Sequence, residues 1–173
     1  MFKLISLTLL TSLLIIAPWS VNEAEATCNC SNDLVVFGTY ETASLVNIES
    51  LPVATLIDTG ATTTALDARN IKMYINRQGK RWVYYDFHHK PSGKMVSMHQ
   101  PVSRVARIIT HSGSPKERAV VRNTISIGKT KRFLEVSLID RSNFPQQLLI
   151  GRNFLNRTAL VNSGKSYLQS KEP

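Results

Sequence analysis

The sequence has very little cysteine. Its 173 residues contain two, Cys28 and Cys30, and both lie close to the N-terminus. A disulfide framework therefore cannot hold a core together. The two thiols can form a strained bridge across Asn29, link two chains or stay free, and the sequence leaves these alternatives open. The fold must instead be stabilised by an apolar core.

The sequence also lacks the residue patterns that bind metals and nucleotides. Its four histidines do not have the His-Glu-x-x-His spacing of zinc peptidases, and no cysteine lies near them. No Gly-x-x-x-x-Gly-Lys-Ser/Thr phosphate loop occurs either. We therefore predict no metal and no cofactor. We interpret the histidines as surface residues on loops: His88, His89, His99 and His111.

The first 26 residues have the order of a secretory signal peptide: Lys3, an apolar run at residues 4–18, and then Ala24-Glu25-Ala26. A run of about 15 apolar residues is shorter than the roughly 20 that a membrane-spanning helix needs, which disfavours a retained anchor. Glu25 disfavours a lipoprotein at Cys28, because an apolar residue is expected before that cysteine. We predict cleavage after Ala26, export to the periplasm or the medium, and a mobile segment at residues 27–33.

Removing residues 1–26 leaves 173 − 26 = 147 residues, which suits one domain and leaves little room for two. This mature chain has 21 − 1 = 20 Lys and Arg against 12 − 2 = 10 Asp and Glu, a formal charge of +10. Such a charge favours anionic partners, for example nucleic acid, a cell-envelope polymer or acidic polypeptides. The basic residues are scattered and not interleaved with aromatics. We therefore expect no specific nucleic-acid binding and interpret most of the charge as solvated surface.

The mature chain consists of short apolar runs separated by turn residues, with almost no helical periodicity. This pattern predicts an all-β domain. Turns at 76–79 and 128–129 indicate two hairpins. One short helix is expected from Gly151 to Asn156, and two polar segments, 88–101 and 111–115, are candidate mobile loops. The predicted strands are 34–40, 41–48, 51–57, 72–75, 81–87, 102–110, 119–127, 132–139 and 148–150, followed by an extended segment at 158–168.

Two segments concentrate the residues that can do chemistry. Residues 54–66 read Ala-Thr-Leu-Ile-Asp-Thr-Gly-Ala-Thr-Thr-Thr-Ala-Leu, so an apolar strand carries Asp58 to its end and Gly60 lets the backbone turn sharply. Residues 148–155 read Leu-Leu-Ile-Gly-Arg-Asn-Phe-Leu, so Gly151 follows a core strand and Arg152 opens a helix. Taken alone, the first segment fits an ordinary turn, and the second fits a core strand followed by a helix.

Together, and in this order, the two segments resemble the retropepsins, the single-domain aspartic peptidases of retroviruses and their bacterial relatives. The match lies in apolar-apolar-Asp-Thr-Gly-Ala at 56–61 and apolar-apolar-Gly-Arg-Asn-x-Leu at 149–155. The resemblance extends, over nearly all of the mature chain, to a bacterial group often labelled ATP-dependent zinc proteases, through segments such as 116–122 and 164–168. It implies an acid-protease barrel at residues 34–170, whereas zinc and ATP have no matching motif here.

The resemblance implies that Asp58 is catalytic and that Thr59 braces a dimer by a hydrogen bond across its interface. Two carboxylates held close together share one proton, so one can activate water while the other polarises the scissile carbonyl. The chain has a single Asp-Thr-Gly motif and is too short for two lobes. A homodimer that places Asp58 against its counterpart supplies the second carboxylate.

The substrate that this resemblance implies is a polypeptide lying extended, as an added strand. Its expected contacts are Gly60, Ala61, Thr62 and Ile150, with Gly151 and Arg152 as structural support. An anionic component of the cell envelope is a further candidate partner, because the mature chain is basic.

Three departures from the family pattern affect the details. Asp58 and Ile150 are 150 − 58 = 92 positions apart, more than in the compact viral enzymes, so an insertion lies between them and the flap is either 88–101 or 111–115. The acidic residue that pairs with the Gly-Arg arginine in the viral enzymes is absent. We predict that Arg152 either pairs with Asp67 or serves its own helix. Asn162 stands where the bacterial group tends to carry an aspartate, so no carboxylate acts there.

Two other classes of function fit the sequence. A non-catalytic module of the same fold could bind peptides or the cell envelope, and a monomer with an unpaired Asp58 would favour it. A basic protein could bind an anionic polymer, with Asp58 only structural. Binding that depends steeply on salt, and that survives a change at Asp58, would favour this second class.

Overall fold

A computed structural model describes residues 34–108 and 116–171. The predicted signal peptide, the predicted mobile segment 27–33 and the candidate loop 111–115 lie outside these residues. The described chain is nearly all β-strand with one short helix after Gly151, which confirms the predicted fold class. In these ranges no helix is long and apolar enough to cross a membrane.

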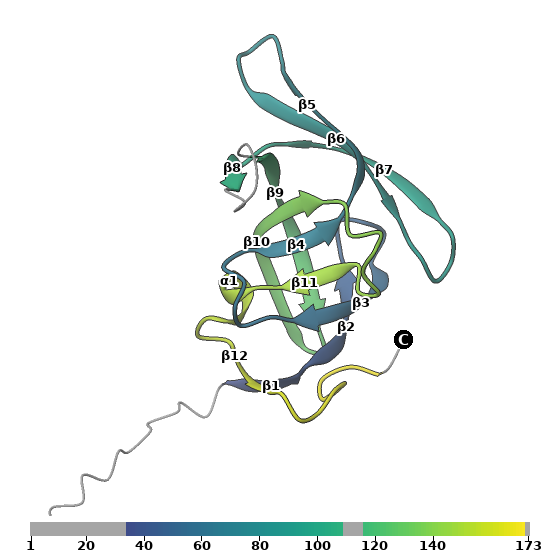
Figure 1. Cartoon of the computed structure of the whole chain (residues 1–173), viewed down its shortest axis with the longest axis vertical. Coiled ribbons are helices and arrows are strands. Elements are labelled where there is room, and N and C mark those ends of the chain that lie inside the picture. Colours follow the sequence, from purple (N-terminus) through teal and green to yellow (C-terminus); the bar gives the residue numbers. More distant parts are fainter. Residues whose placement is uncertain (1–33, 109–115, 172–173) are drawn as a thin grey trace, which may run out of the picture. The chain divides into compact units, whose positions relative to one another are not determined.

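The secondary-structure elements follow one another along the chain with short connections (Figure 1). They are β1 (Val35–Gly38), β2 (Tyr40–Leu45), β3 (Leu51–Ile57), β4 (Thr64–Asp67), β5 (Arg69–Ile75), β6 (Arg81–His88), β7 (Met95–Pro101), β8 (Arg104–Ile108), β9 (Lys116–Ile127), β10 (Thr130–Ile139), β11 (Leu148–Ile150), α1 (Arg152–Leu155) and β12 (Ala159–Asn162).

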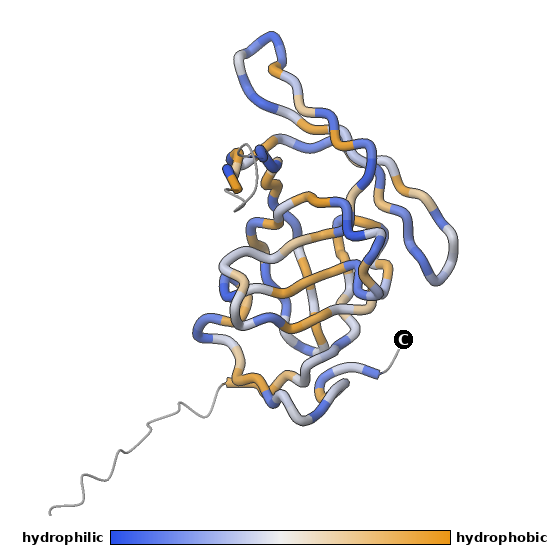
Figure 2. Tube along the Cα trace, in the orientation of Figure 1, coloured by the Kyte–Doolittle hydropathy of each residue, from blue (hydrophilic) through white to orange (hydrophobic). Residues whose placement is uncertain are grey.

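Six of the strands close into a barrel. Their order is β10-β4-β11-β3-β2-β9, and the pairing of β10 with β9 closes the ring. Along β3, Val53 and Ile57 are buried while their neighbours are partly exposed, as the alternation of a strand requires. Figure 2 shows apolar stretches along the barrel strands and hydrophilic residues at the turn between β5 and β6. The core is formed mainly by the barrel strands and extends to buried residues of β6 and α1.

Parallel pairing of β3 with β11 determines where the functional residues lie. Thr55 stands opposite Leu148 and Ile57 opposite Ile150, so the two strands end side by side. Strand β4 runs antiparallel to β11 on its other side, with Leu66 opposite Leu148. The residues that follow β3 and β11 therefore meet at one end of the barrel, although they are far apart in the sequence.

A three-stranded antiparallel sheet, in the order β5-β6-β7, forms the insertion. The prediction that 88–101 is a mobile loop is wrong for most of the segment, because β7 pairs with β6 from His88↔Met95 to Trp82↔Pro101. Val96 and Met98 pack against the core, whereas the intervening residues of β7 are exposed. The polar outer face and the Pro-Ser-Gly turn explain why the sequence resembles a loop.

Strand β4 and the burial of His89 also differ from the prediction. Strand β4 was not predicted, because its four residues follow a run of threonines that resembles a turn. His89 is not a surface residue. It is buried, and its ring nitrogens contact the Ser92 hydroxyl and the Pro52 carbonyl, each at 2.7 Å.

The buried carboxylate of Glu41 holds the C-terminal segment against β1 and β2. Glu41 is fully buried and accepts hydrogen bonds from the Gly38 amide at 2.8 Å and the Leu168 amide at 3.0 Å. The Gln169 amide at 3.2 Å and the Ser170 hydroxyl at 2.6 Å complete its partners. A buried charge is tolerated when it accepts this many hydrogen bonds, so Glu41 connects residues 168–170 to the barrel.

We expect Glu41→Ala to lower the free energy of unfolding by about 2–4 kcal/mol, because several buried donors would lose their acceptor. Urea denaturation followed by circular dichroism measures this change. Glu117→Ala is the matched control, since the Glu117 side chain is 53% exposed and makes one ion pair at 3.6 Å. Equal denaturation midpoints for the two variants would contradict the structural role of Glu41.

Candidate active site

Asp58 lies immediately after β3, at the end of the barrel, and is partly exposed. Its amide donates to the Ile150 carbonyl at 2.9 Å. Its Oδ1 accepts hydrogen bonds from the amides of Gly60 at 2.8 Å and Ala61 at 3.1 Å. The turn that follows the strand thus orients the carboxylate. Oδ2 receives no hydrogen bond from the described residues, so it is available to a reacting group.

Gly151 lies against the backbone of the loop after Asp58. A Cβ atom at this position would stand 2.8 Å from the Thr63 carbonyl carbon, 2.9 Å from the Ala61 oxygen and 3.0 Å from the Thr64 nitrogen. These are backbone atoms, which cannot swing away as a flexible side chain can. Only glycine allows this approach, which explains the glycine of the Gly-Arg-Asn segment.

Arg152 holds the same loop from the solvent side. Its Nη1 donates to the carbonyls of Thr59 at 3.1 Å and Gly60 at 2.8 Å, and its Nη2 donates to the Thr62 hydroxyl at 2.9 Å. The Arg152 amide donates to the Ala61 carbonyl at 2.8 Å. The planar fork of the guanidinium suits this set of acceptors. Thr62 therefore takes the place of the acidic partner found in the viral enzymes.

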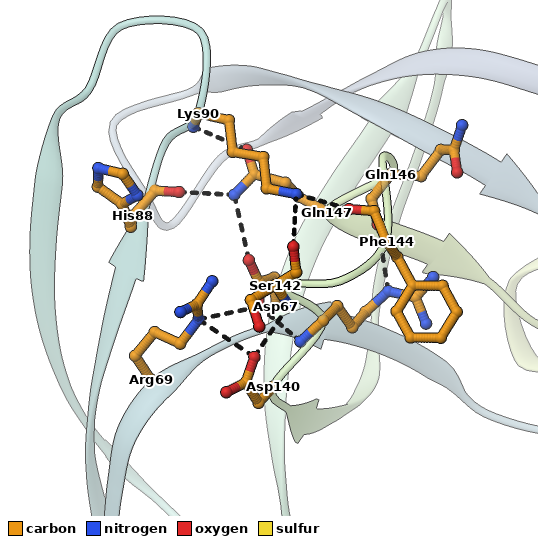
Figure 3. A network of polar contacts seen from close by, with 10 residues as sticks. Asp67, Arg69, His88, Lys90, Asp140, Ser142, Phe144, Gln146 and Gln147 are labelled. Atoms are coloured by element: carbon orange, nitrogen blue, oxygen red, sulfur yellow. Dashed lines mark hydrogen bonds and ion pairs between the residues drawn. The ribbon is translucent and has the colours of Figure 1, made fainter.

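The predicted pairing of Arg152 with Asp67 is wrong. Asp67 is buried at the other end of β4, where its carboxylate accepts from the Arg141 amide at 2.7 Å and faces the Gln147 side-chain amide at 3.5 Å (Figure 3). Because a strand rises about 3.3 Å per residue, the four residues of β4 separate Asp67 from the Asp58 loop by about 10 Å. The alternative, in which Arg152 serves only its own helix, is also incorrect, since its guanidinium binds the loop.

The contacts of Gln147 locate the flap candidate 88–101 relative to Asp58. The Gln147 side-chain amide donates to the His88 carbonyl at 2.6 Å, and Gln147 Oε1 accepts from the Lys90 amide at 2.9 Å (Figure 3). Gln147 precedes β11, whereas Asp58 lies beside the residue that ends it. The turn between β6 and β7 is therefore remote from the candidate active site. The other flap candidate, 111–115, lies outside the described residues.

Asn153 also holds the Asp58 loop. It was not predicted as a site residue, although it belongs to the Gly-Arg-Asn motif. Its Oδ1 accepts from the Thr64 amide and the Thr64 hydroxyl, each at 2.9 Å, and its Nδ2 donates to the Glu135 carbonyl at 2.7 Å. The Thr64 hydroxyl accepts from the Gly151 amide at 3.2 Å. Asn153 thus connects the Asp58 loop, β10 and α1.

Arg104 also reaches the site and had no signal in the sequence. It begins β8, and its Nη2 lies 3.4 Å from the Thr63 hydroxyl. Its Nε donates to Glu135 Oε2 at 2.7 Å, and the Ser103 hydroxyl donates to Oε1 at 2.7 Å. These hydrogen bonds lower the pKa of Glu135, and the one from Arg104 contributes most. The contact depends on strands that are remote in sequence.

The predicted site residues therefore divide into two groups. The structure gathers seven of them around one loop: Asp58, Thr59, Gly60, Ala61, Thr62, Gly151 and Arg152. The Ile150 side chain, in contrast, is fully buried in the core and does not reach the surface that the others share. Thr59 is exposed, and its hydroxyl donates to no group in the described part of the chain.

Beside Thr59, a hollow of about 360 Å³ opens at the surface. Its lining includes Arg152, Arg157 and the exposed Leu160 of β12. Val36, which stands opposite Leu160 in the pairing of β1 with β12, is also exposed. An apolar strip therefore lies next to the Asp-Thr-Gly turn.

Comparison with known proteins gives one family and several distant relatives. The family profile described as "RimB-like: Retropepsin-like aspartic endopeptidase RimB" matches residues 36–172. A probable alpha-L-glutamate ligase of Shewanella pealeana is 23% identical over 139 residues, which are 79% of this chain and 30% of the relative. Another, from Parasynechococcus marenigrum, is 25% identical, with 77% of this chain and 29% of the relative covered. The chain thus spans less than a third of these relatives.

Solved structures with a similar fold include the following example. It is a Legionella pneumophila protein of unknown function, with a TM-score of 0.65 and 24% identity, and the match covers 78% of this chain and 98% of that protein. At this identity the likeness concerns the fold alone.

We expect Gly151→Ala to displace the loop after Asp58 and to destabilise the domain by about 2 kcal/mol or more, because the new methyl group would overlap backbone atoms. Thermal unfolding, together with amide hydrogen exchange of residues 59–64, measures both effects. Gly164→Ala is the control, since the nearest atom to a Cβ there is 3.5 Å away. A Gly151→Ala variant as stable as Gly164→Ala would show that the close approach is unimportant.

Proposed function

Because the chain belongs to the RimB-like family of retropepsin-like aspartic endopeptidases, we propose that it hydrolyses peptide bonds with two Asp58 carboxylates, one from each protomer of a homodimer. The observation that carries this proposal is the geometry of Asp58. Its Oδ1 is held by the amides of Gly60 and Ala61, and its carboxylate is partly exposed at the end of a rigid barrel strand. A catalytic carboxylate needs such fixed orientation with one oxygen free.

The chemistry proposed for the pair follows from charge. Two carboxylates held within a few ångströms of each other cannot both ionise readily, so the pair keeps one proton. The ionised group takes a proton from water, and the resulting nucleophile attacks the scissile carbonyl carbon. The protonated group donates a hydrogen bond to the carbonyl oxygen as negative charge develops there. The C–N bond then breaks as the group that took the proton of water delivers it to the leaving amine. The other group recovers its proton as the carbonyl re-forms, so the pair again holds one proton.

The proposed dimer supplies what one protomer lacks. The described domain is a single barrel with one Asp-Thr-Gly turn, and Asp58 contacts no second carboxylate in it. The exposed Thr59 hydroxyl and the neighbouring apolar strip of Val36 and Leu160 support a twofold interface at this end of the barrel. In such an arrangement Thr59 would donate its hydrogen bond across the interface.

An acidic polypeptide is the substrate class that we propose. The hairpin of β8 and β9 carries Arg and Lys at five described positions and one Glu, and its first residue reaches the Asp58 loop. The relatives named probable alpha-L-glutamate ligase contain a segment similar to this chain, and their name refers to glutamate, an acidic amino acid. The basic residues are Arg104, Arg107, Lys116, Arg118 and Arg122.

Replacing Asp58 tests catalysis directly. We expect Asp58→Asn to lower kcat/KM by at least about 100-fold, because an amide cannot accept the proton of water. The assay is cleavage of an unstructured acidic protein by the mature chain at mildly acidic to neutral pH, analysed by mass spectrometry. Thr42→Ala, which alters a hydroxyl bonded to the Lys171 carbonyl, is the control. If wild type and Asp58→Asn gave identical fragments, the non-catalytic binding module would be the better hypothesis.

The dimer is tested at its proposed interface. We expect Leu160→Glu to weaken self-association and to reduce cleavage in proportion, because a charge would be buried against the partner. Sedimentation equilibrium gives the dissociation constant, and circular dichroism checks the fold. Ile75→Glu is the control, since Ile75 is 63% exposed on the insertion. A wild type that remains monomeric at millimolar concentration and still cleaves peptides would refute the shared active site.

A further inference from the structure

Arg104 is held in a fixed orientation beside the proposed active site. Its Nε donates to Glu135 Oε2 at 2.7 Å, while the Ser103 hydroxyl occupies Oε1 at 2.7 Å. The Ser103 amide donates to the Val120 carbonyl at 2.7 Å, so the start of β8 is itself fixed. The hydrogen bonds from Arg104 and Ser103 lower the pKa of Glu135 and so favour its charged form. The Arg104 side chain is therefore preorganised although it is 45% exposed.

This anchoring uses one edge of the guanidinium and leaves the other available. Nε donates to the carboxylate of Glu135. Within the described residues, the two terminal nitrogens make a single contact, from Nη2 to the Thr63 hydroxyl at 3.4 Å. That distance is longer than that of a good hydrogen bond, so the contact is weak. A pair of terminal Nη groups matches the two oxygens of a carboxylate.

The surroundings of Arg104 are suited to an extended chain. Among the described strands, β8 pairs with β9 only, so its other edge is free to accept another strand. Thr63 lies five positions after Asp58 on the loop that Arg152 holds. A peptide passing Asp58 along this edge would bring a side chain to Arg104. Arg122 stands opposite Glu135 and offsets its charge, which leaves the position electropositive.

We infer that Arg104 is the specificity-determining residue of the site and binds the carboxylate of an acidic substrate side chain through its terminal nitrogens. This inference rests on the proposed peptidase function, since it names the group that recognises the substrate. Glu135 and Ser103 act as positioning residues that hold the guanidinium. An Arg104 that served only to connect β8 with β10 would affect acidic and neutral peptides alike.

The test separates binding from catalysis. Fluorescence anisotropy measures the Kd of two labelled peptides for the Asp58→Asn variant. One peptide carries Glu at its acidic positions, and the other has Gln at the same positions. We expect Arg104→Gln to raise the Kd of the Glu peptide about tenfold or more, which is the loss expected for one charged hydrogen-bonded pair. The Kd of the Gln peptide should change less than twofold. Arg104→Lys should give an intermediate Kd, because it keeps the charge and loses the fork.

Arg77→Gln is the control, since Arg77 is exposed in the turn between β5 and β6 and lies outside the pair of strands β8 and β9. An equal loss for both peptides, or an equal effect of Arg104→Gln and Arg77→Gln on the Glu peptide, would overturn the assignment. Cleavage of the two peptides by the wild-type protein, which has Asp58, is measured separately. If it cleaved neither peptide while the binding preference still depended on Arg104, the peptidase proposal would fail and the recognition role of Arg104 would stand.

Discussion

The backbone contact between Gly151 and the loop after Asp58 is the constraint on which the site depends. A Cβ at Gly151 would lie within 3.0 Å of three backbone atoms, so the two segments meet without any side chain between them. The parallel pairing of β3 with β11 brings the segments that follow them together, because both strands end at the same level. With this contact formed, Arg152 and Asn153 are in place to bind the loop through its carbonyls and through Thr64.

Arg152 holds the loop after Asp58 by hydrogen bonds whose acceptors are mostly backbone atoms, and the Asp58 carboxylate is not one of these acceptors. Arg152 does not approach the Asp58 carboxylate, which instead receives two amide hydrogen bonds from its own turn. A strong cation at this position would stabilise the ionised form and oppose the sharing of a proton. The arrangement fixes the orientation of Asp58 and leaves its second oxygen free for chemistry.

Two buried carboxylates elsewhere in the described chain, those of Glu41 and Asp67, are also satisfied by hydrogen bonds. Glu41 accepts from three backbone amides and one hydroxyl, and Asp67 accepts from Arg141 and faces Arg69 and Gln147. Each connects segments that are remote in sequence, namely the C-terminal segment to β2, and the loop before β11 to β4. Since an unpaired buried carboxylate would be costly, these groups fix the register of the chain around the barrel.

Much of the fold could be predicted because the local patterns agree with it. The strand 51–57, the two hairpin turns at 76–79 and 128–129, and the short helix after Gly151 follow from alternation and turn residues. Strand β7 could not be predicted, because an edge strand with a polar face has the composition of a loop, and only its partner β6 reveals it. The pairing of Arg152 with Asp67 was predicted wrongly, because the sequence did not reveal strand β4, whose length separates the two residues.

The sequence by itself determined that Asp58 ends an apolar strand, that Gly60 turns the chain and that Gly151-Arg152 follows a second core strand, because each is a local property of neighbouring residues. Only the tertiary structure decided which groups Arg152 binds, that Ile150 points into the core, and that Arg104 and Glu135 lie beside the loop. These contacts join residues tens of positions apart. Their geometry depends on strand order and register, which no single segment encodes.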